Sequence, residues 1–345
     1  MLKKIIYSAT VILGVLTLVF LLFRGMGDPA KLVAGQNVDP RTLENIRKEL
    51  YLDQPGWKQY LLYLNDLSPI SFHTDAEISG RQLRGFFFEA NTTRRPGIKW
   101  PYLGRSFQSK KEVGSIIAHV MPATLVLALA AMILATIIGI SLGVLAAVKK
   151  GTLLDHGSII GSIAGISAPS FYMAIPFAYI FGLWLHDYTG LPVTGSLYAI
   201  NEVTGERYIE IKNLVLPALT LGIRPMAIIT QLTRSSMLDV LSQDFIRTAR
   251  AKGLSEHRVL WKHALPNALN PVLTSVTGWF AEMLAGAFFV EYIFGWNGLG
   301  RVTVQALEKL DYPVLMGSLL VSALLFVLIN LLADMLYRLI DPRIR

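Results

Sequence analysis

Six long apolar runs separated by charged stretches stand out along the chain. A helix needs roughly 20 apolar residues to cross the hydrocarbon core of a bilayer, and each run is about that long or longer. Outside the runs no second hydrophobic core is apparent. We therefore expect an all-α integral membrane protein with six transmembrane helices. The runs are Ile5–Phe23, Met121–Val148, Gly157–Leu185, Leu214–Thr233, Pro271–Val290 and Pro313–Tyr337.

The first run resembles a signal peptide because Lys3 and Lys4 precede it. A signal has a shorter apolar region, about 7–15 residues, and ends in a small-residue cleavage site. This run is longer and passes directly into Arg24 with no A-x-A pattern nearby. We expect residues 1–23 to be a retained transmembrane helix.

The polar segment 24–112 is expected to be extracytoplasmic. In Asp39–Leu52 apolar residues recur every three to four positions, and Pro40 suits a first helical turn. Gly56–Leu67 predicts a second helix, whereas 68–101 shows no sustained period and is expected to be irregular. Residues 113–345 would form the remaining core of five transmembrane helices.

Small residues and prolines mark two features inside the apolar runs. The motifs Gly139-x-x-x-Gly143 and Gly161-x-x-x-Gly165 predict close helix packing. Pro169 and Pro176 interrupt the third run, so we expect a kink there, because each proline removes a helix hydrogen bond.

The distribution of basic residues predicts the orientation of the chain. The formal net charge is +8. With both termini inside, the inner segments hold thirteen Lys and Arg residues and the two short outer loops hold four. Cytoplasmic segments carry such an excess. The charge therefore indicates membrane topology with both termini cytoplasmic, and nucleic-acid binding is not expected.

Several kinds of chemistry have no support in the sequence. The chain has no Cys, no Lys follows a Gly as a P-loop requires, and the His residues show no metal-ligand spacing. The glycines of Phe294–Arg301 follow an apolar run and predict a turn at the outer surface. We expect no catalytic residue, no metal site and no cofactor bound by this chain.

The charged segment Asp244–Leu269 has the pattern of two short helices joined by a glycine, which is more than a simple loop between two spans requires. Ser242 is a plausible N-cap for a helix that Gly253 ends in the left-handed conformation. Ser255 would cap a second short helix that stops before Pro266.

Two interpretations of this segment remain open at this point. Phe245, Ile246 and Ala249 share one helix face, and Arg247 and Arg250 project elsewhere. The segment could be an amphipathic element held by anionic lipid. It could equally be a docking helix whose apolar side chains enter a groove on a cytoplasmic partner.

Arg224 and Glu282 lie inside apolar runs, where charges are costly and usually functional. Each lies about eleven residues into its expected span, which is close to mid-depth at about 1.5 Å per residue. They could pair with each other, line a substrate path, or face a partner subunit.

The charged segment also resembles a known motif. A Gly followed twelve residues later by Leu-Pro, with small residues four and five positions before it, is similar to the EAA loop of ABC-transporter permeases. Pieces such as LYLDQPGWKQYL, LGRSF, FVEYIFGWNGLGR and DYPVLMGSLL, with FRGMGDPA and the terminal DPRIR, extend the resemblance over nearly the whole chain. They are similar to the dipeptide/oligopeptide permease family. The EAA positions are Thr248, Ala249, Gly253, Leu265 and Pro266.

This resemblance implies a six-helix permease of the type I importer kind in the bacterial cytoplasmic membrane. It implies a second homologous permease, two cytoplasmic ATPases that hold ATP and Mg, and an extracytoplasmic solute-binding protein. Residues 238–266 would be the coupling loop, with Gly253 as its turn. The docking face would be Phe245, Ile246 and Ala249, and the rim charges Arg247 and Arg250.

The chain departs from the family pattern in two places. Arg247 stands where the family has an acidic residue, so a salt bridge to the ATPase cannot be carried over. Residues from about 66 to 101 look inserted. They could contact a binding protein or only decorate the rim.

Two other classes of function are weighed against this one. A motor-independent secondary transporter or channel should show paired interrupted spans and buried coupling carboxylates, for which Glu282 alone is poor support. A membrane anchor or assembly factor would show no transport. The family handles peptides, nickel chelates, glutathione and some sugars, so the residues do not choose the substrate.

Overall fold

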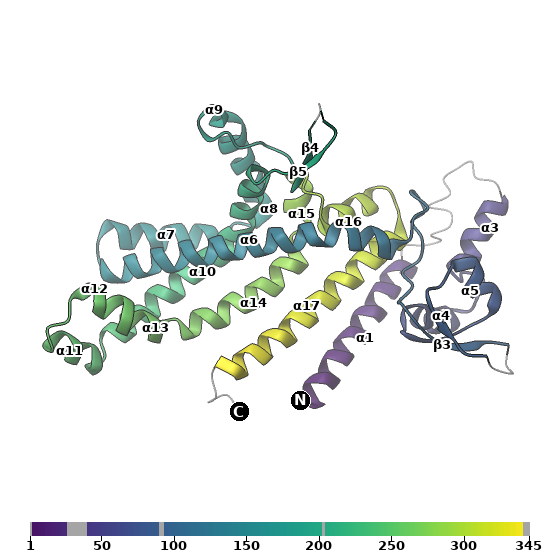
Figure 1. The fold of residues 1–345 in the computed structure, drawn as a ribbon, viewed down its shortest axis with the longest axis horizontal. Helices are drawn as coiled ribbons and strands as arrows, with labels where there is room; N and C mark the ends of the chain where they lie inside the picture. The colour runs from purple at the N-terminus through teal and green to yellow at the C-terminus, as the bar shows by residue number, and fades with distance from the viewer. Residues whose placement is uncertain (1, 26–39, 90–92, 202–203, 341–345) are drawn as a thin grey trace. The chain divides into compact units, whose positions relative to one another are not determined.

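The described chain is mainly helical and forms two compact units (Figure 1). The computed structural model describes residues 2–25, 40–89, 93–201 and 204–340. Unit 1 contains Met1–His119 and Val302–Leu324, and unit 2 contains Val120–Arg301 and Leu325–Arg345. Most of FRGMGDPA and all of DPRIR lie outside the described residues.

Unit 1 begins with α1 (Leu2–Gly25), which covers the first apolar run. Both helices expected in the following segment are present, as α3 (Pro40–Glu49) and α4 (Gly56–Leu67). The short helix α5 (Asp75–Arg81) then begins with a capping box. In it the Thr74 side chain accepts a hydrogen bond from the Glu77 amide, and the Glu77 carboxylate accepts one from the Thr74 amide.

The expected irregular stretch 68–101 is instead an ordered antiparallel sheet, and the all-α expectation is wrong here. Its strand order is β1-β3-β2, from Ile70–His73, Arg95–Lys99 and Gly85–Phe87. Strands of three to five residues contain too few alternations to stand out in the sequence. A hairpin of β4 (Tyr198–Ile200) and β5 (Arg207–Ile209) lies in unit 2.

In unit 2, helices α6 (Val113–Val148), α7 (Leu153–Ser167) and α10 (Lys212–Leu241) lie side by side (Figure 1). A Cβ at Gly143 would lie 2.5 Å from the Cβ of Thr233, and one at Gly139 would lie 2.8 Å from Ile229. Both therefore allow α6 to approach α10, as the sequence predicts.

The second glycine motif follows the prediction only in part. Gly165 faces Ala227 of α10, where an added Cβ would lie 3.1 Å from the alanine Cβ, but nothing lies within 4 Å of such an atom at Gly161.

The third apolar run contains the expected kink, and it is large. The helix stops at Ala168, whose ψ of 125° is extended, because the residue before a proline avoids the helical region. Beyond Pro169 the chain continues as α8 (Ser170–Phe177) and the π-helix η1 (Ala178–Trp184), bent by 110° from α7. The run is therefore not one straight span.

Within the described residues, three single helices are long and apolar enough to cross a membrane, or up to four with the bent pair. They are α6, α10 and the Tyr312–Ala333 part of α17 (Tyr312–Ile340). The fifth run is divided at Ala287 into α14 (Asn270–Gly286) and α15 (Phe288–Ile293). The remaining elements are α9 (His186–Thr189), α11 (Asp244–Ala251), α12 (Glu256–Arg258), η2 (Val259–Ala264), α13 (Leu265–Ala268) and α16 (Leu299–Glu308).

Candidate functional site

Residues 244–269, here named the charged loop, form a helix–turn–helix at one end of α10 (Figure 1). Its first helix, α11, ends before Gly253, whose φ of +75° is the predicted left-handed conformation. A bidentate ion pair closes the turn: Arg250 Nε lies 2.8 Å from one Glu256 carboxylate oxygen, and its Nη2 lies 3.2 Å from the other. The predicted N-cap is wrong, because Ser242 stays helical and Gln243 is the extended residue that precedes α11.

The second half of the loop continues further than the sequence predicts. The helix does not stop before Pro266 but runs through η2 and α13 to Ala268. Pro266 is the second residue of α13, directly after the π-helix η2.

The apolar face of α11 is divided between the interior and the surface. Ile246 is fully buried and Ala249 is 6% exposed, whereas Phe245 is 41% exposed. The expected docking face is therefore wrong in two of its three residues. Ile246 and Ala249 are packed inside the chain and are not available to a partner in this conformation. They belong to a cluster with Val144, Ala147, Met237, Val240, Val259, Ala264, Leu265 and Ala268.

The surface of α11 combines one large apolar side chain with polar ones. Phe245, Arg247, Thr248 and Arg250 are all exposed. Arg247 lies 3.3 Å from the Asp244 carboxylate, an exposed pair of little energetic weight. This exposed face is suited to contact a partner surface, while the buried face connects it to α6 and α10.

The structure brings Arg224 and Glu282 together from α10 and α14. The Arg224 Nη1 lies 3.8 Å from the Glu282 Oε1, and its guanidinium lies over the Trp279 ring at 5.2 Å from the centroid. Both charged side chains are about half exposed in the single chain. Glu282 and Trp279 also line a shallow pocket with Thr274, Ser275, Gly278, Phe326 and Asn330.

Glu291 is a buried polar centre that the sequence analysis did not single out. It is fully buried in α15. Its carboxylate accepts hydrogen bonds from Thr124 Oγ1 at 2.7 Å and from the amides of Gly300 at 2.7 Å and Arg301 at 3.1 Å. Thr124 in turn accepts a bond from the Leu299 amide at 2.7 Å.

The glycine-rich stretch after Glu291 begins as the predicted turn and passes into α16 at Leu299, and steric contacts explain its glycines. A Cβ at Gly298 would collide with the Glu291 carboxylate, and one at Gly300 would collide with the backbone of Phe288. Gly295 has a φ of +66°. The sequence feature that could have pointed to this buried centre is a glutamate shortly before a Gly-x-x-Gly-x-Gly stretch.

In unit 1, Asp311 joins two of the quoted sequence pieces. It is 5% exposed and accepts hydrogen bonds from Ser106 Oγ at 2.5 Å and from the Phe107 amide at 3.0 Å. LGRSF and DYPVLMGSLL therefore meet in the fold although about 205 residues separate the bonded side chains.

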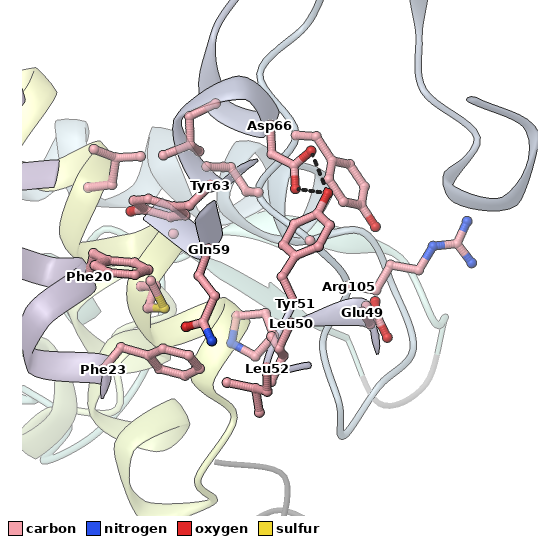
Figure 2. A pocket seen from close by; sticks show the side chains of 18 of the residues that line it. Phe20, Phe23, Glu49, Leu50, Tyr51, Leu52, Gln59, Tyr63, Asp66 and Arg105 are labelled. Carbon is pink, nitrogen blue, oxygen red and sulfur yellow. Dashed lines mark hydrogen bonds between the residues drawn. The ribbon is translucent and has the colours of Figure 1, made fainter. Parts of the chain in front are cut away.

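Unit 1 also holds a pocket of about 120 Å³ (Figure 2). Phe20 and Phe23 of α1 lie on one side of it, and Asp66 and Tyr51 lie on the other. The Tyr51 hydroxyl donates to the Asp66 carboxylate at 3.1 Å. A pocket with one apolar and one polar wall suits an amphipathic group.

An ion pair stabilises the polar wall. Arg81 Nη1 lies 2.8 Å from an Asp66 oxygen, and its guanidinium stacks over the Tyr51 ring. Burial raises the pKa of Asp66, and the nearby Arg81 opposes that shift. On α5, the His73 ring, whose Nδ1 lies 3.5 Å from the carboxylate, lowers the pKa of the Glu77 carboxyl to about 2.

Two family models together match almost the whole chain. Residues 139–345 match the binding-protein-dependent transport system inner membrane component, and residues 1–128 match the N-terminal part of such membrane components.

Three relatives show the same likeness over nearly their full length. The dipeptide transport system permease protein DppB of Alkalihalophilus pseudofirmus is 36% identical over 99% of this chain and 98% of its own. The di/tripeptide permease protein of Pseudomonas aeruginosa is 38% identical over 96% and 94%. The dipeptide permease protein of Escherichia coli K12 is 37% identical over 92% and 90%.

The fold itself has a solved counterpart. A chain of the inward-facing MetNI methionine ABC transporter matches with a TM-score of 0.50 and 17% identity, covering 66% of this chain and 97% of that one. At that identity the likeness concerns the fold alone. From the family models and the full-length relatives, we conclude that this chain belongs to the family of binding-protein-dependent transport system inner membrane components.

Proposed function

We propose that this chain is the permease subunit of an ATP-driven importer of di- or oligopeptides and forms half of its translocation pathway. The dipeptide and di/tripeptide permeases that resemble it over nearly their full length support this substrate class. Alternating access would be driven by ATP hydrolysis on separate chains.

The proposed topology has six transmembrane helices in the cytoplasmic membrane, with both termini in the cytoplasm. The inner-membrane description of the family and the excess of basic residues in the inner segments over the two short outer loops support it, since long loops cross largely regardless of charge. The charged loop then lies on the cytoplasmic side and residues 24–112 on the outer side.

The single observation that carries the coupling role is the division of α11 into two faces. Phe245 is exposed beside Arg247 and Arg250, while Ile246 and Ala249 are packed against residues of α6 and α10. A displacement of the exposed face by a docked ATPase would be passed to these two helices, because a close-packed core transmits strain. Thr248, Gly253, Leu265 and Pro266 would shape the loop.

The proposed partners are a second permease of the same family, two ABC ATPases and an extracytoplasmic binding protein. Arg224 and Glu282 would either stabilise the helix pair α10–α14 or line the path, where they could meet the charged ends of a peptide. Their half exposure in the single chain is compatible with both roles.

The test is a mild-detergent pull-down of the tagged chain from its native membranes, followed by mass spectrometry. Wild-type chain should recover a P-loop ATPase and a second permease. With Phe245→Asp, the amount of ATPase recovered should fall at least tenfold, because a charge replaces the large apolar side chain of the exposed face of α11.

The matched control is Tyr208→Asp, which changes a side chain of similar exposure, 46%, in the β4–β5 hairpin. It should recover the ATPase as the wild type does. If the wild-type chain were recovered alone from an extract in which other complexes survive, the ATP-driven proposal would be wrong.

A further inference from the structure

One face of the three-stranded sheet in unit 1 is apolar and uncovered. The pairings Ile70↔Ile98 and Phe86↔Ile98 place three side chains in one row, and Phe72 pairs with Pro96 in the next. Exposed fractions on this face range from 53% to 83%. We name it the outer sheet face, and it consists of Ile70, Phe72, Phe86, Phe88, Ile98 and Trp100.

The opposite face of the same sheet is packed. Ser71, His73 and Lys99 are at most 4% exposed. Gly97 lies between Ser71 and Phe87 in the register, and a Cβ there would collide with the Phe87 ring. An antiparallel sheet with one packed face usually turns polar residues to water on the other, so six large apolar side chains require a different environment.

Contacts between α4 and α1 set the depth of this region along the first membrane helix. The hydroxyl of Tyr60 lies 2.6 Å from the Thr17 hydroxyl, and its ring lies 5.2 Å from that of Phe20. Thr17 is six residues before Phe23, where the apolar run ends, or about 9 Å at 1.5 Å per residue. Helix α4 therefore packs against α1 at the level of hydrocarbon, not above it.

The sheet is joined directly to α4. Strand β1 packs against α4, and the Asn65 side chain of α4 donates to the Phe72 carbonyl at 3.0 Å and accepts from the Phe72 amide at 2.9 Å. On α4, Trp57 and Leu61 are also exposed, at 68% and 54%.

The composition of the face fits the boundary between lipid tails and headgroups. Its members are Phe, Ile and Trp; Trp concentrates at that boundary, and Phe and Ile suit the hydrocarbon beside it. Each of its two strand rows, Ile70–Ile98–Phe86 and Phe72–Pro96–Phe88, contains no charged residue.

We propose that the outer sheet face enters the outer leaflet of the lipid bilayer, so that residues 68–101 form an interfacial module beside α1. The occupant of the face is therefore lipid and not a protein partner. This inference rests on the proposed function, because it requires α1 to be a membrane helix with its C-terminal end outside.

The absence of cysteine makes a direct test possible, since one introduced thiol labels a single site. Phe86→Cys is suitable because that side chain is 83% exposed and its loss leaves the core intact. The full chain, labelled with a polarity-sensitive fluorophore, is reconstituted into vesicles that contain phospholipid brominated on its acyl chains. Quenching by bromine is compared with quenching by aqueous iodide.

Two control positions separate the possible failures. A label at Ser79→Cys, on the exposed side of α5, should be quenched by iodide and not by brominated lipid. A label at Leu18→Cys, which is 57% exposed on α1, should be quenched by brominated lipid whatever the sheet does. Failure at position 18 would contradict the membrane topology rather than the sheet inference.

With the two controls behaving as stated, we expect the label at position 86 to be quenched several-fold more by brominated lipid than the label at position 79. Equal iodide quenching at positions 86 and 79 would overturn the inference. So would shielding at position 86 that appears only after a binding protein or second permease is added, because the face would then belong to a protein interface.

Discussion

Two glutamates of unit 2 show how surroundings decide the role of a carboxylate. Glu291 is fully buried and accepts hydrogen bonds from one hydroxyl and two amides, whereas Glu282 is about half exposed beside a single guanidinium at 3.8 Å. A buried carboxylate without such donors would be strongly destabilising. The backbone after Glu291 therefore stabilises it, while Glu282 stays accessible.

Glu291→Gln should destabilise the protein measurably. The amide group replaces one carboxylate oxygen with a donor, which would face either the Thr124 hydroxyl or the Gly300 and Arg301 amides, so the three donated hydrogen bonds cannot all be kept. We expect about 1–3 kcal/mol, the usual cost of an unsatisfied buried group. The change is measured as a lower melting temperature of the purified chain in detergent.

Glu206→Gln is the control for this substitution, because Glu206 is exposed in the β4–β5 region. It should leave the melting temperature unchanged. An equal melting temperature for the Glu291 variant would show that the hydrogen bonds at Glu291 contribute little to stability.

The sequence identified Arg224 and Glu282 but not Glu291, for a physical reason. A charge in the middle of an apolar run is conspicuous, because hydrocarbon offers it no partner. Glu291 comes just after the end of such a run, where a carboxylate is ordinary. Its burial depends on Thr124, which is distant in sequence, and no local pattern reports that contact.

At the scale of elements, glycines decide how closely the long helices approach. Gly139 and Gly143 lie against α10, where an added Cβ would be within 2.9 Å of other atoms. Gly161 has open space in its place. The sequence motif is the same in both helices, so the difference comes from which face each helix turns to its neighbour.

Gly143→Ala should therefore lower stability and Gly161→Ala should not. The first forces α6 away from Thr233, and overpacking of this kind costs about 1–3 kcal/mol. The matched substitution at Gly161 controls for the change in helix propensity. The measurement is the melting temperature of each variant, and equal shifts would contradict the close α6–α10 contact.

Local patterns predicted most helices and missed what depends on tertiary contacts. Helices α3 and α4 and the left-handed Gly253 follow from spacing and turn chemistry. The sheet of residues 70–99 was missed, because its strands are short and their pairing is not local. The burial of Ile246 was also missed, since an amphipathic pattern does not say whether the chain or a partner covers the apolar face.

At the scale of the whole molecule, the chain combines a membrane helical core with contacts that link distant segments. Asp311 holds the 106–108 turn in unit 1, and Glu291 holds the first residues of α16 in unit 2. The sequence predicted the family from its motifs, and the family models and relatives confirm it. The kink that the prolines of the third run predict is present and large, because the break at Pro169 bends the chain by 110°.

The central proposal is ATP-driven peptide import through a complex that contains this chain. The most direct measurement is uptake of isotopically labelled di- and tripeptides by vesicles that contain the co-purified complex with its binding protein. Uptake is compared with hydrolysable ATP, with a non-hydrolysable analogue and without nucleotide, on the side of the ATPases. The proposal predicts accumulation only with hydrolysable ATP and its loss in Phe245→Asp. Equal accumulation without ATP, driven by an ion gradient alone, would contradict it.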